Sequence, residues 1–112
     1  MQVSPIASVS FQAQIPKRLN DELFWEANRR GHSTCEAFFS QTKNIKTWGH
    51  DSSSLAIFEE RTRDGVTRAL GFVSNYLAPL KKVLLPAKET VFDSFMALKE
   101  CDIIDAENSL GI

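Results

Sequence analysis

SLAIFEERTRDGVTRALGFVSNY, residues 54–76, carries the clearest structural signal in this sequence. Asp64-Gly65 is a dipeptide typical of tight β-turns, and it separates two runs of strand-like composition. The stretch therefore predicts a β-hairpin. Because a tight turn joins antiparallel strands, we expect an antiparallel sheet at the centre of the chain.

Charged side chains gather around the turn of this predicted hairpin. Glu59 and Glu60 are neighbours on one strand, so they point to opposite faces, and one of them can pair with an arginine across the hairpin. Arg61, Arg63 and Arg68 flank the turn. They are candidate partner-binding residues that could hold a phosphate or an acidic chain. The more ordinary interpretation is that these charges keep the hairpin soluble and its edges unpaired.

The chain after the hairpin predicts one short edge segment and two helices. Residues 78–86 contain a proline near each end, Pro79 and Pro86, which favours a loop or a short edge strand. Residues 86–100 are expected to form a helix with Pro86 as a possible first residue. Asp102 is then the expected cap of a last short helix over residues 103–110.

The chain before the hairpin begins with an alternating pattern over residues 8–15, which predicts a half-buried strand that ends at Pro16. The apolar positions are Val9, Phe11, Ala13 and Ile15. The polar positions between them are Ser10, Gln12 and Gln14. Such a strand is marginal alone, so it must pair either with the hairpin of the same chain or with a second copy of itself.

Two helices are expected between this strand and the hairpin. Leu19, Leu23 and Ala27 form the apolar face of the first, which ends at Gly31. Ser33 and Glu36 have the spacing of a capping box, so Ser33 is the expected N-cap of the second. The apolar face of this second helix is expected to contain Phe38, Phe39, Thr42, Ile45 and Trp48.

Trp25 does not belong to the apolar face of the first helix. It could therefore anchor a partner, because tryptophan is enriched at protein interfaces. If the chain forms one compact domain, we expect Trp25 to be buried against the second half.

The fold class that follows is α+β. It has a strand-helix-helix N-terminal half, a central antiparallel hairpin and two C-terminal helices. We expect one domain over residues 1–112, with a possible subdivision at 1–49 and 50–112. The first 50 residues have six basic and four acidic side chains, whereas residues 51–112 have seven basic and ten acidic ones. The acidic half, residues 51–112, is therefore a candidate for contact with an unknown protein partner.

Composition excludes little. A net charge of −1 does not indicate that the protein binds nucleic acid or an anionic membrane. No apolar run can span a bilayer and no conventional signal peptide is evident, so a cytoplasmic protein is expected. Cys35 and Cys101 are expected to be reduced thiols, and Cys35 is a weak candidate for a redox role beside His32. No catalytic, metal-binding or nucleotide-binding motif is found, so we expect that the protein is not an enzyme and binds no cofactor.

Residues 9–49 resemble the ribbon–helix–helix family of DNA-binding repressors. The resemblance rests on the alternating strand ending in Pro16, the Leu19/Leu23/Ala27 helix, Gly31, and the helix that starts with Ser33-Thr34-Cys35-Glu36. It implies a homodimer in which residues 9–15 of two chains pair as a ribbon in the major groove of duplex DNA. It also implies base contacts and a phosphate clamp. The base-reading residues would be Ser10, Gln12 and Gln14, and the clamp Ser33 and Thr34.

Two hypotheses for function remain open. The first is a dimeric DNA-binding regulator of transcription, in which glutamine amides donate to and accept from adenine. The second is a small intracellular protein-interaction module without catalytic activity. The first hypothesis requires a dimer through residues 9–15, whereas the second permits a monomer.

Overall fold

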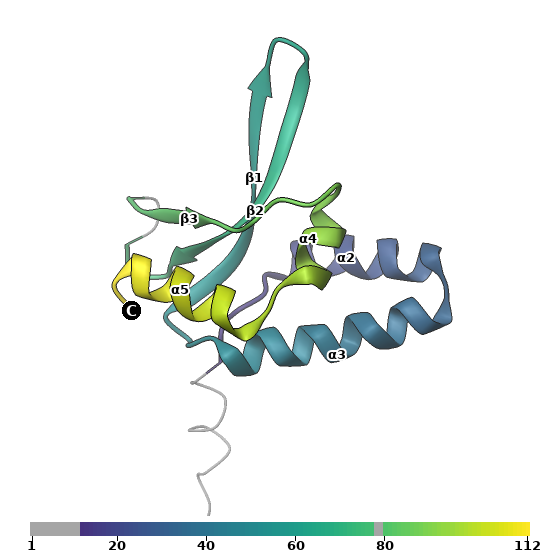
Figure 1. Cartoon of the computed structure of the whole chain (residues 1–112), viewed down its shortest axis with the longest axis horizontal. Coiled ribbons are helices and arrows are strands. Elements are labelled where there is room, and N and C mark those ends of the chain that lie inside the picture. The colour runs from purple at the N-terminus through teal and green to yellow at the C-terminus, as the bar shows by residue number, and fades with distance from the viewer. Residues whose placement is uncertain (1–11, 78–79) are drawn as a thin grey trace, which may run out of the picture.

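A β-hairpin flanked by two pairs of helices forms the molecule in this computed structural model, which describes residues 12–77 and 80–112 (Figure 1). The helices that precede the sheet are α2 (Lys17–Arg30) and α3 (His32–Trp48). The strands are β1 (Ser53–Thr62), β2 (Gly65–Ser74) and β3 (Lys82–Leu84). The last helices are α4 (Val91–Ala97) and α5 (Glu100–Leu110). The predicted α+β class is therefore confirmed.

The predicted hairpin is confirmed. β1 and β2 pair antiparallel from Ser53↔Ser74 to Thr62↔Gly65, which leaves Arg63 and Asp64 as the loop. Gly65 has a φ of 141°, a backbone conformation that side chains with a Cβ rarely adopt. β3 adds to the other edge of β2, so the described strands form an antiparallel sheet in the order β1-β2-β3.

The order expected for the first half, with a strand first, is wrong, because helices precede the strands in the described chain. Residues 8–11 lie outside the described residues. Of the remainder, only Gln14 makes a bridge, which is parallel to Ser54 of β1. The reason is Pro16: its carbonyl already accepts a hydrogen bond from the backbone N–H of Asn20, so the chain turns into α2 directly after Ile15.

Three expected helix starts are also wrong. α3 begins at His32 with Gly31 as its N-cap, so Ser33 lies inside the first turn and caps nothing. α4 begins at Val91 instead of Pro86, because the Thr90 hydroxyl accepts the backbone N–H of Asp93 at 3.0 Å. These starts depend on single hydrogen bonds and turn geometry, which residue spacing alone does not fix.

The start of α5 differs in the same way. This helix begins at Glu100 with Lys99 as N-cap, and Asp102 lies within the first turn. The Asp102 carboxylate reaches back to accept the backbone N–H of Lys99 at 2.9 Å. Asp102 therefore stabilises the helix start as expected, but from a position inside the helix.

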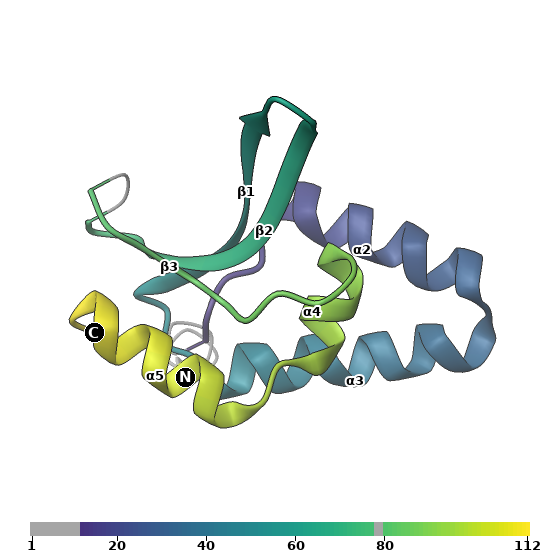
Figure 2. The ribbon, with the colours of Figure 1, turned by 45° about the horizontal axis from the view of Figure 1, so that its top comes forward.

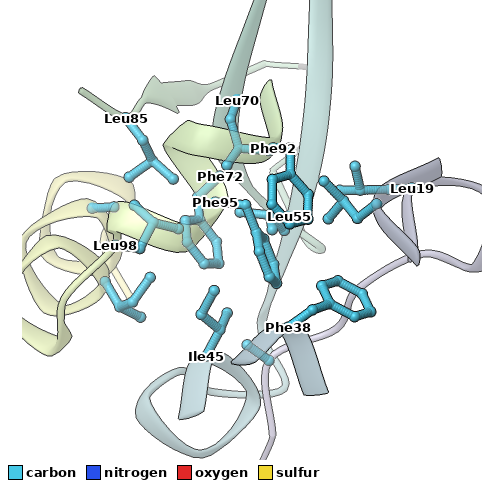
Figure 3. Packing of buried hydrophobic residues seen from close by; sticks show 14 of the residues in the cluster. Leu19, Phe38, Ile45, Leu55, Leu70, Phe72, Leu85, Phe92, Phe95 and Leu98 are labelled. Atoms are coloured by element: carbon cyan, nitrogen blue, oxygen red, sulfur yellow. The ribbon is translucent and has the colours of Figure 1, made fainter. Parts of the chain in front are cut away.

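The hydrophobic core lies between the sheet and the helices (Figure 3). Phe38 of α3, Phe72 of β2 and Phe95 of α4 are its largest fully buried side chains. Leu55 and Leu70 extend the same sheet face, and the face of α2 predicted to be buried is confirmed. Both halves of the chain contribute to this one cluster.

The distal half of the hairpin projects beyond the helices (Figures 1 and 2). Every residue from Glu59 to Arg68 is exposed. One ion-paired arginine connects this arm to the helices: the Arg68 Nη2 atom lies 2.8 Å from both carboxylate oxygens of Glu22 on α2. Arg68 also contacts Glu59, its cross-strand neighbour, at 3.2 Å, so the expected Glu–Arg pair is confirmed.

Candidate interaction surface

α2 and α3 lie antiparallel and present one face of the pair to the core (Figure 2). Leu23 and Ala27 of α2 and Phe38 and Ile45 of α3 are fully buried on that face. The opposite face of the pair has no element of the described chain packed on it in either view (Figures 1 and 2). Its side chains therefore meet solvent.

Trp25 lies on this outer face and is 66% exposed. The expectation that it is buried in a single compact fold is therefore wrong. Trp25 follows Leu23 by two residues, which places it about 200° around the helix from that buried side chain. With Leu23 directed to the core, Trp25 must point away from it.

Phe39 shares this outer face and is 56% exposed, whereas the sequence placed it on the buried face of its helix. The buried positions of α3 are Phe38, Gln41 and Ile45. The sequence shows two adjacent phenylalanines, of which a helix can bury only one fully. Hydrophobicity alone would favour the burial of either phenylalanine. In the structure Phe38 and the polar Gln41 are buried on the core side of α3, and Phe39 is not.

Phe24 joins these two side chains into one surface, which we call the aromatic face: Phe24, Trp25 and Phe39. The ring centroids of Phe24 and Trp25 are 5.7 Å apart in an edge-to-face arrangement, and those of Phe24 and Phe39 are 6.0 Å apart. These are favourable separations for aromatic pairs. The sequence hypothesis named Trp25 but missed Phe24 and Phe39.

The aromatic face is supported from beneath by the core. The ring of Phe39 lies 5.6 Å from that of Phe38, and Phe38 in turn contacts Phe92 and Phe95 of α4. A chain of aromatic contacts therefore runs from the surface to the centre of the molecule. Side chains held in this way lose little conformational freedom when they bind.

Charged side chains flank the aromatic face along both helices. Asp21 and Arg29 lie one helical turn on either side of Trp25, with side chains 49% and 74% exposed. Glu36 and Lys43 occupy the corresponding places around Phe39 and are exposed. On each helix, therefore, an acidic side chain lies on one side of the exposed aromatic residue and a basic side chain lies on the other.

The predicted base-reading residues have the expected exposure where they are described. Gln12 and Gln14 are exposed and Ala13 between them is buried, while Ser10 lies outside the described residues. The backbone of Gln14 is bonded within the chain: its N–H donates to the Ser53 carbonyl at 3.0 Å, and its carbonyl accepts the Leu55 N–H at 2.9 Å. Base contact by these side chains stays a prediction.

The residues of the predicted phosphate clamp lie at the start of α3, whereas Gln14 precedes α2, so the whole length of α2 separates them. Ser33 is exposed and Thr34 is half-buried in the first turn of α3. α2 alone is about 21 Å long, so one chain does not bring Gln14 and Ser33 together. Their joint role on DNA stays a prediction.

The predicted arginines divide into two kinds. Arg68 is held by Glu22 and Glu59, so its charge is already matched within the chain. Arg61 and Arg63 are exposed near the hairpin turn and form no ion pair with a described residue. A groove of about 500 Å³ lies beside the arm, between α2 and β1, and its charged lining consists of Arg18, Glu22, Glu59 and Arg68. Its charges neutralise one another.

A buried carboxylate, which no sequence pattern singled out, connects α5 to the start of β1. Glu107 of α5 is 3% exposed and accepts the His50 N–H at 2.7 Å and the Ser53 hydroxyl at 2.6 Å. One of its oxygens also lies 3.0 Å from Nδ1 of His50. Every oxygen of this carboxylate is used for packing α5 against the entry to β1, so the cluster is structural.

The remaining chemical candidates are few. Cys35 is half-buried with its Sγ 3.8 Å from Asn28 Oδ1, Cys101 is exposed, and both are free thiols. Within residues 12–77 and 80–112, no three His, Cys, Asp or Glu side chains are grouped to hold a metal ion. In the same part of the chain, no helix has the length and apolarity to cross a bilayer.

Comparisons with known proteins found no family model that matches the chain and no significant match among curated proteins or solved structures.

Proposed function

We propose that this chain is a protein-interaction module that binds its partner through the aromatic face. The observation that carries the proposal is the aromatic face, in which the exposed rings of Trp25 and Phe39 both contact the half-buried ring of Phe24 and rest on the core. Exposed apolar groups scattered singly are ordinary, but grouped aromatics on a rigid base are typical of binding surfaces.

The surroundings of the aromatic face support the same function. Protein interfaces combine an apolar centre with a charged rim, and here Asp21, Arg29, Glu36 and Lys43 provide the rim. We rank this function above a DNA-binding ribbon because the backbone of Gln14 is already bonded to β1. A partner strand on that side of the segment would first have to displace those bonds.

Site-specific photo-cross-linking tests the proposal. A benzophenone amino acid replaces Trp25 in one protein and Tyr76 in another, since Tyr76 is also an exposed aromatic, 79% accessible, but lies outside the aromatic face. After irradiation in cells that express the chain, we expect protein adducts from position 25 and none above background from position 76. Phe39→Ala should remove the adducts from position 25, because it removes one of the three aromatic side chains of the apolar centre.

The proposal also requires that the captured partner binds directly. The purified partner should bind the wild-type chain, and Phe39→Ala should weaken that binding at least about tenfold, whereas Tyr76→Ala should leave it unchanged. Equal labelling from positions 25 and 76, or no adduct from position 25, would overturn the proposal.

A further inference from the structure

The charged side chains around the aromatic face are arranged symmetrically about its exposed aromatic residues. Asp21 precedes Trp25 by four residues, and Arg29 follows it by four. On α3, Glu36 precedes Phe39 by three residues and Lys43 follows it by four. Each helix thus has an acidic and a basic side chain at nearly equal distances on either side of an exposed aromatic residue. Within one copy, Asp21 pairs with Lys17 at 2.8 Å and Arg29 with Glu26 at 2.6 Å, and Glu36 lies 3.2 Å from His32 Nε2. These intrachain pairs are exposed, so their charges can be shared with a second copy at little cost.

This pattern is complementary to itself when one copy is turned by 180°. If α2 packs antiparallel on α2 of a second copy about an axis at Trp25, Asp21 of each copy faces Arg29 of the other. The same rotation sets Glu36 of each copy against Lys43 of the other. One axis can serve both helices because Trp25 and Phe39 lie at similar heights along the pair, as the 6.0 Å contact between Phe24 and Phe39 shows.

We infer that the partner of the aromatic face is a second copy of this chain, and that two helical pairs pack face to face as a four-helix dimer. This inference rests on the proposed function and names the partner of the same surface. It differs from the dimer implied by a ribbon, because residues 9–15 take no part in it. The net charge of −1 per copy opposes such association very little.

The size of the surface sets the strength of the dimer. Helices of 14 and 17 residues are about 21 and 25 Å long, and with a packing distance of about 9 Å the two copies bury roughly 900 Å² together. Interfaces of this size belong to weak, reversible complexes. The dissociation constant should therefore lie in the range of about 10 to 500 µM.

Solution mass measured against concentration tests the dimer. By sedimentation equilibrium from about 5 to 500 µM, the mass should rise from 12.6 kDa towards twice that value. Trp25→Ala should raise the dissociation constant at least about tenfold, whereas Tyr76→Ala should not change it. Circular dichroism confirms that each variant is folded. A monomer at every concentration, or a dimer that Trp25→Ala does not weaken, overturns the inference.

A charge-reversal experiment tests the register independently of the aromatic side chains. Asp21→Arg alone places two arginines opposite each other at both ends of α2, and Arg29→Asp alone places two aspartates there, so each variant should remain monomeric. An equimolar mixture should associate, because every acidic side chain of one variant then faces a basic one of the other. Failure of the mixture to associate overturns the antiparallel register.

The cross-linking experiment separates failure of this inference from failure of the proposed function. Adducts from position 25 with the mass of two copies support both. Adducts only with a different protein overturn the inference and retain the interaction module. The absence of any adduct from position 25, together with a monomeric mass, overturns both.

Discussion

Gln41 shows how one buried amide holds two helices in register. Its Nε2 atom lies 3.0 Å from the carbonyl oxygen of Phe95 and 2.9 Å from that of Leu98. Both acceptors belong to the end of α4, where a helix leaves its last carbonyl groups without partners. Gln41 supplies these partners from α3, where it is buried on the same helix as Phe38 and Ile45.

Gln41→Leu should lower the free energy of unfolding by about 1–3 kcal/mol, because the Leu98 carbonyl would stay buried without its donor. Urea unfolding followed by circular dichroism measures the change. Ser40→Leu is the matched control, because position 40 is exposed on the same helix, and its effect should stay within about 0.5 kcal/mol. If the two variants unfold alike, these hydrogen bonds add nothing to stability.

Between elements, Arg30 is the side chain that joins α2 to α4. Its guanidinium lies 2.7 Å from Glu26 and 2.9 Å from Asp93, and stacks 4.7 Å from the centre of the Phe92 ring. Hydrogen bonds from Arg29 and then Arg30 lower the pKa of Glu26 below its usual 4.5. Those from Thr90 and then Arg30 lower the pKa of Asp93 below its usual 3.8.

This connection predicts a loss of stability in acid. A carboxylate whose pKa is lower in the folded chain stabilises the fold fully above its unfolded pKa, and that contribution disappears as the pH falls through the lowered folded value. The Tm should therefore be constant with respect to these two groups above about pH 4.5 and decline below it. The variant with Glu26→Gln and Asp93→Asn should start with a lower Tm at pH 7 and decline less. An equal decline in both proteins would exclude this origin.

Local signals predicted the elements that local geometry determines. Asp64-Gly65 identified the hairpin, and the spacing of Leu19, Leu23 and Ala27 identified the buried face of α2. Pro79 and Pro86 favoured a loop or a short edge strand between them, and the structure has a short strand there, β3. Of the strand expected over residues 8–15, the described residues 12–15 make only the bridge at Gln14, because a period of two describes which side chains are buried and not how long the pairing continues.

The aromatic face was the least predictable feature at this scale. Exposure of Trp25 and Phe39 depends on what packs over the outer face of α2 and α3, and none of the described elements covers that face. A sequence pattern assigns large apolar side chains to the core, since that is where most of them lie. Two aromatic residues outside the core stripe of adjacent helices are the signal that could have located this surface.

Over the whole molecule, the two halves of the chain meet where α3 ends. The Ala13 N–H donates to the carbonyls of Lys46 and Gly49 at 3.2 Å each, and Glu107 of α5 binds the following residue, His50. The first, middle and last parts of the described chain therefore converge on Gly49. A Cβ at this position would lie 2.5 Å from the Ala13 Cβ and 3.3 Å from Glu107 Oε2. This separation is too short for two carbon atoms, so only glycine fits.

Gly49→Ala should therefore cost about 1–3 kcal/mol of folding free energy, because the segment around Ala13 must move away from the end of α3. Ala13→Gly removes the methyl group with which the new side chain would collide. The double variant should therefore be less destabilised than the sum of the two single variants, by roughly 0.5 kcal/mol or more. Unfolding in urea of all four proteins measures this coupling. Additive effects would mean that Ala13 does not pack against Gly49, and that the segment before α2 is held to the fold by its backbone hydrogen bonds alone.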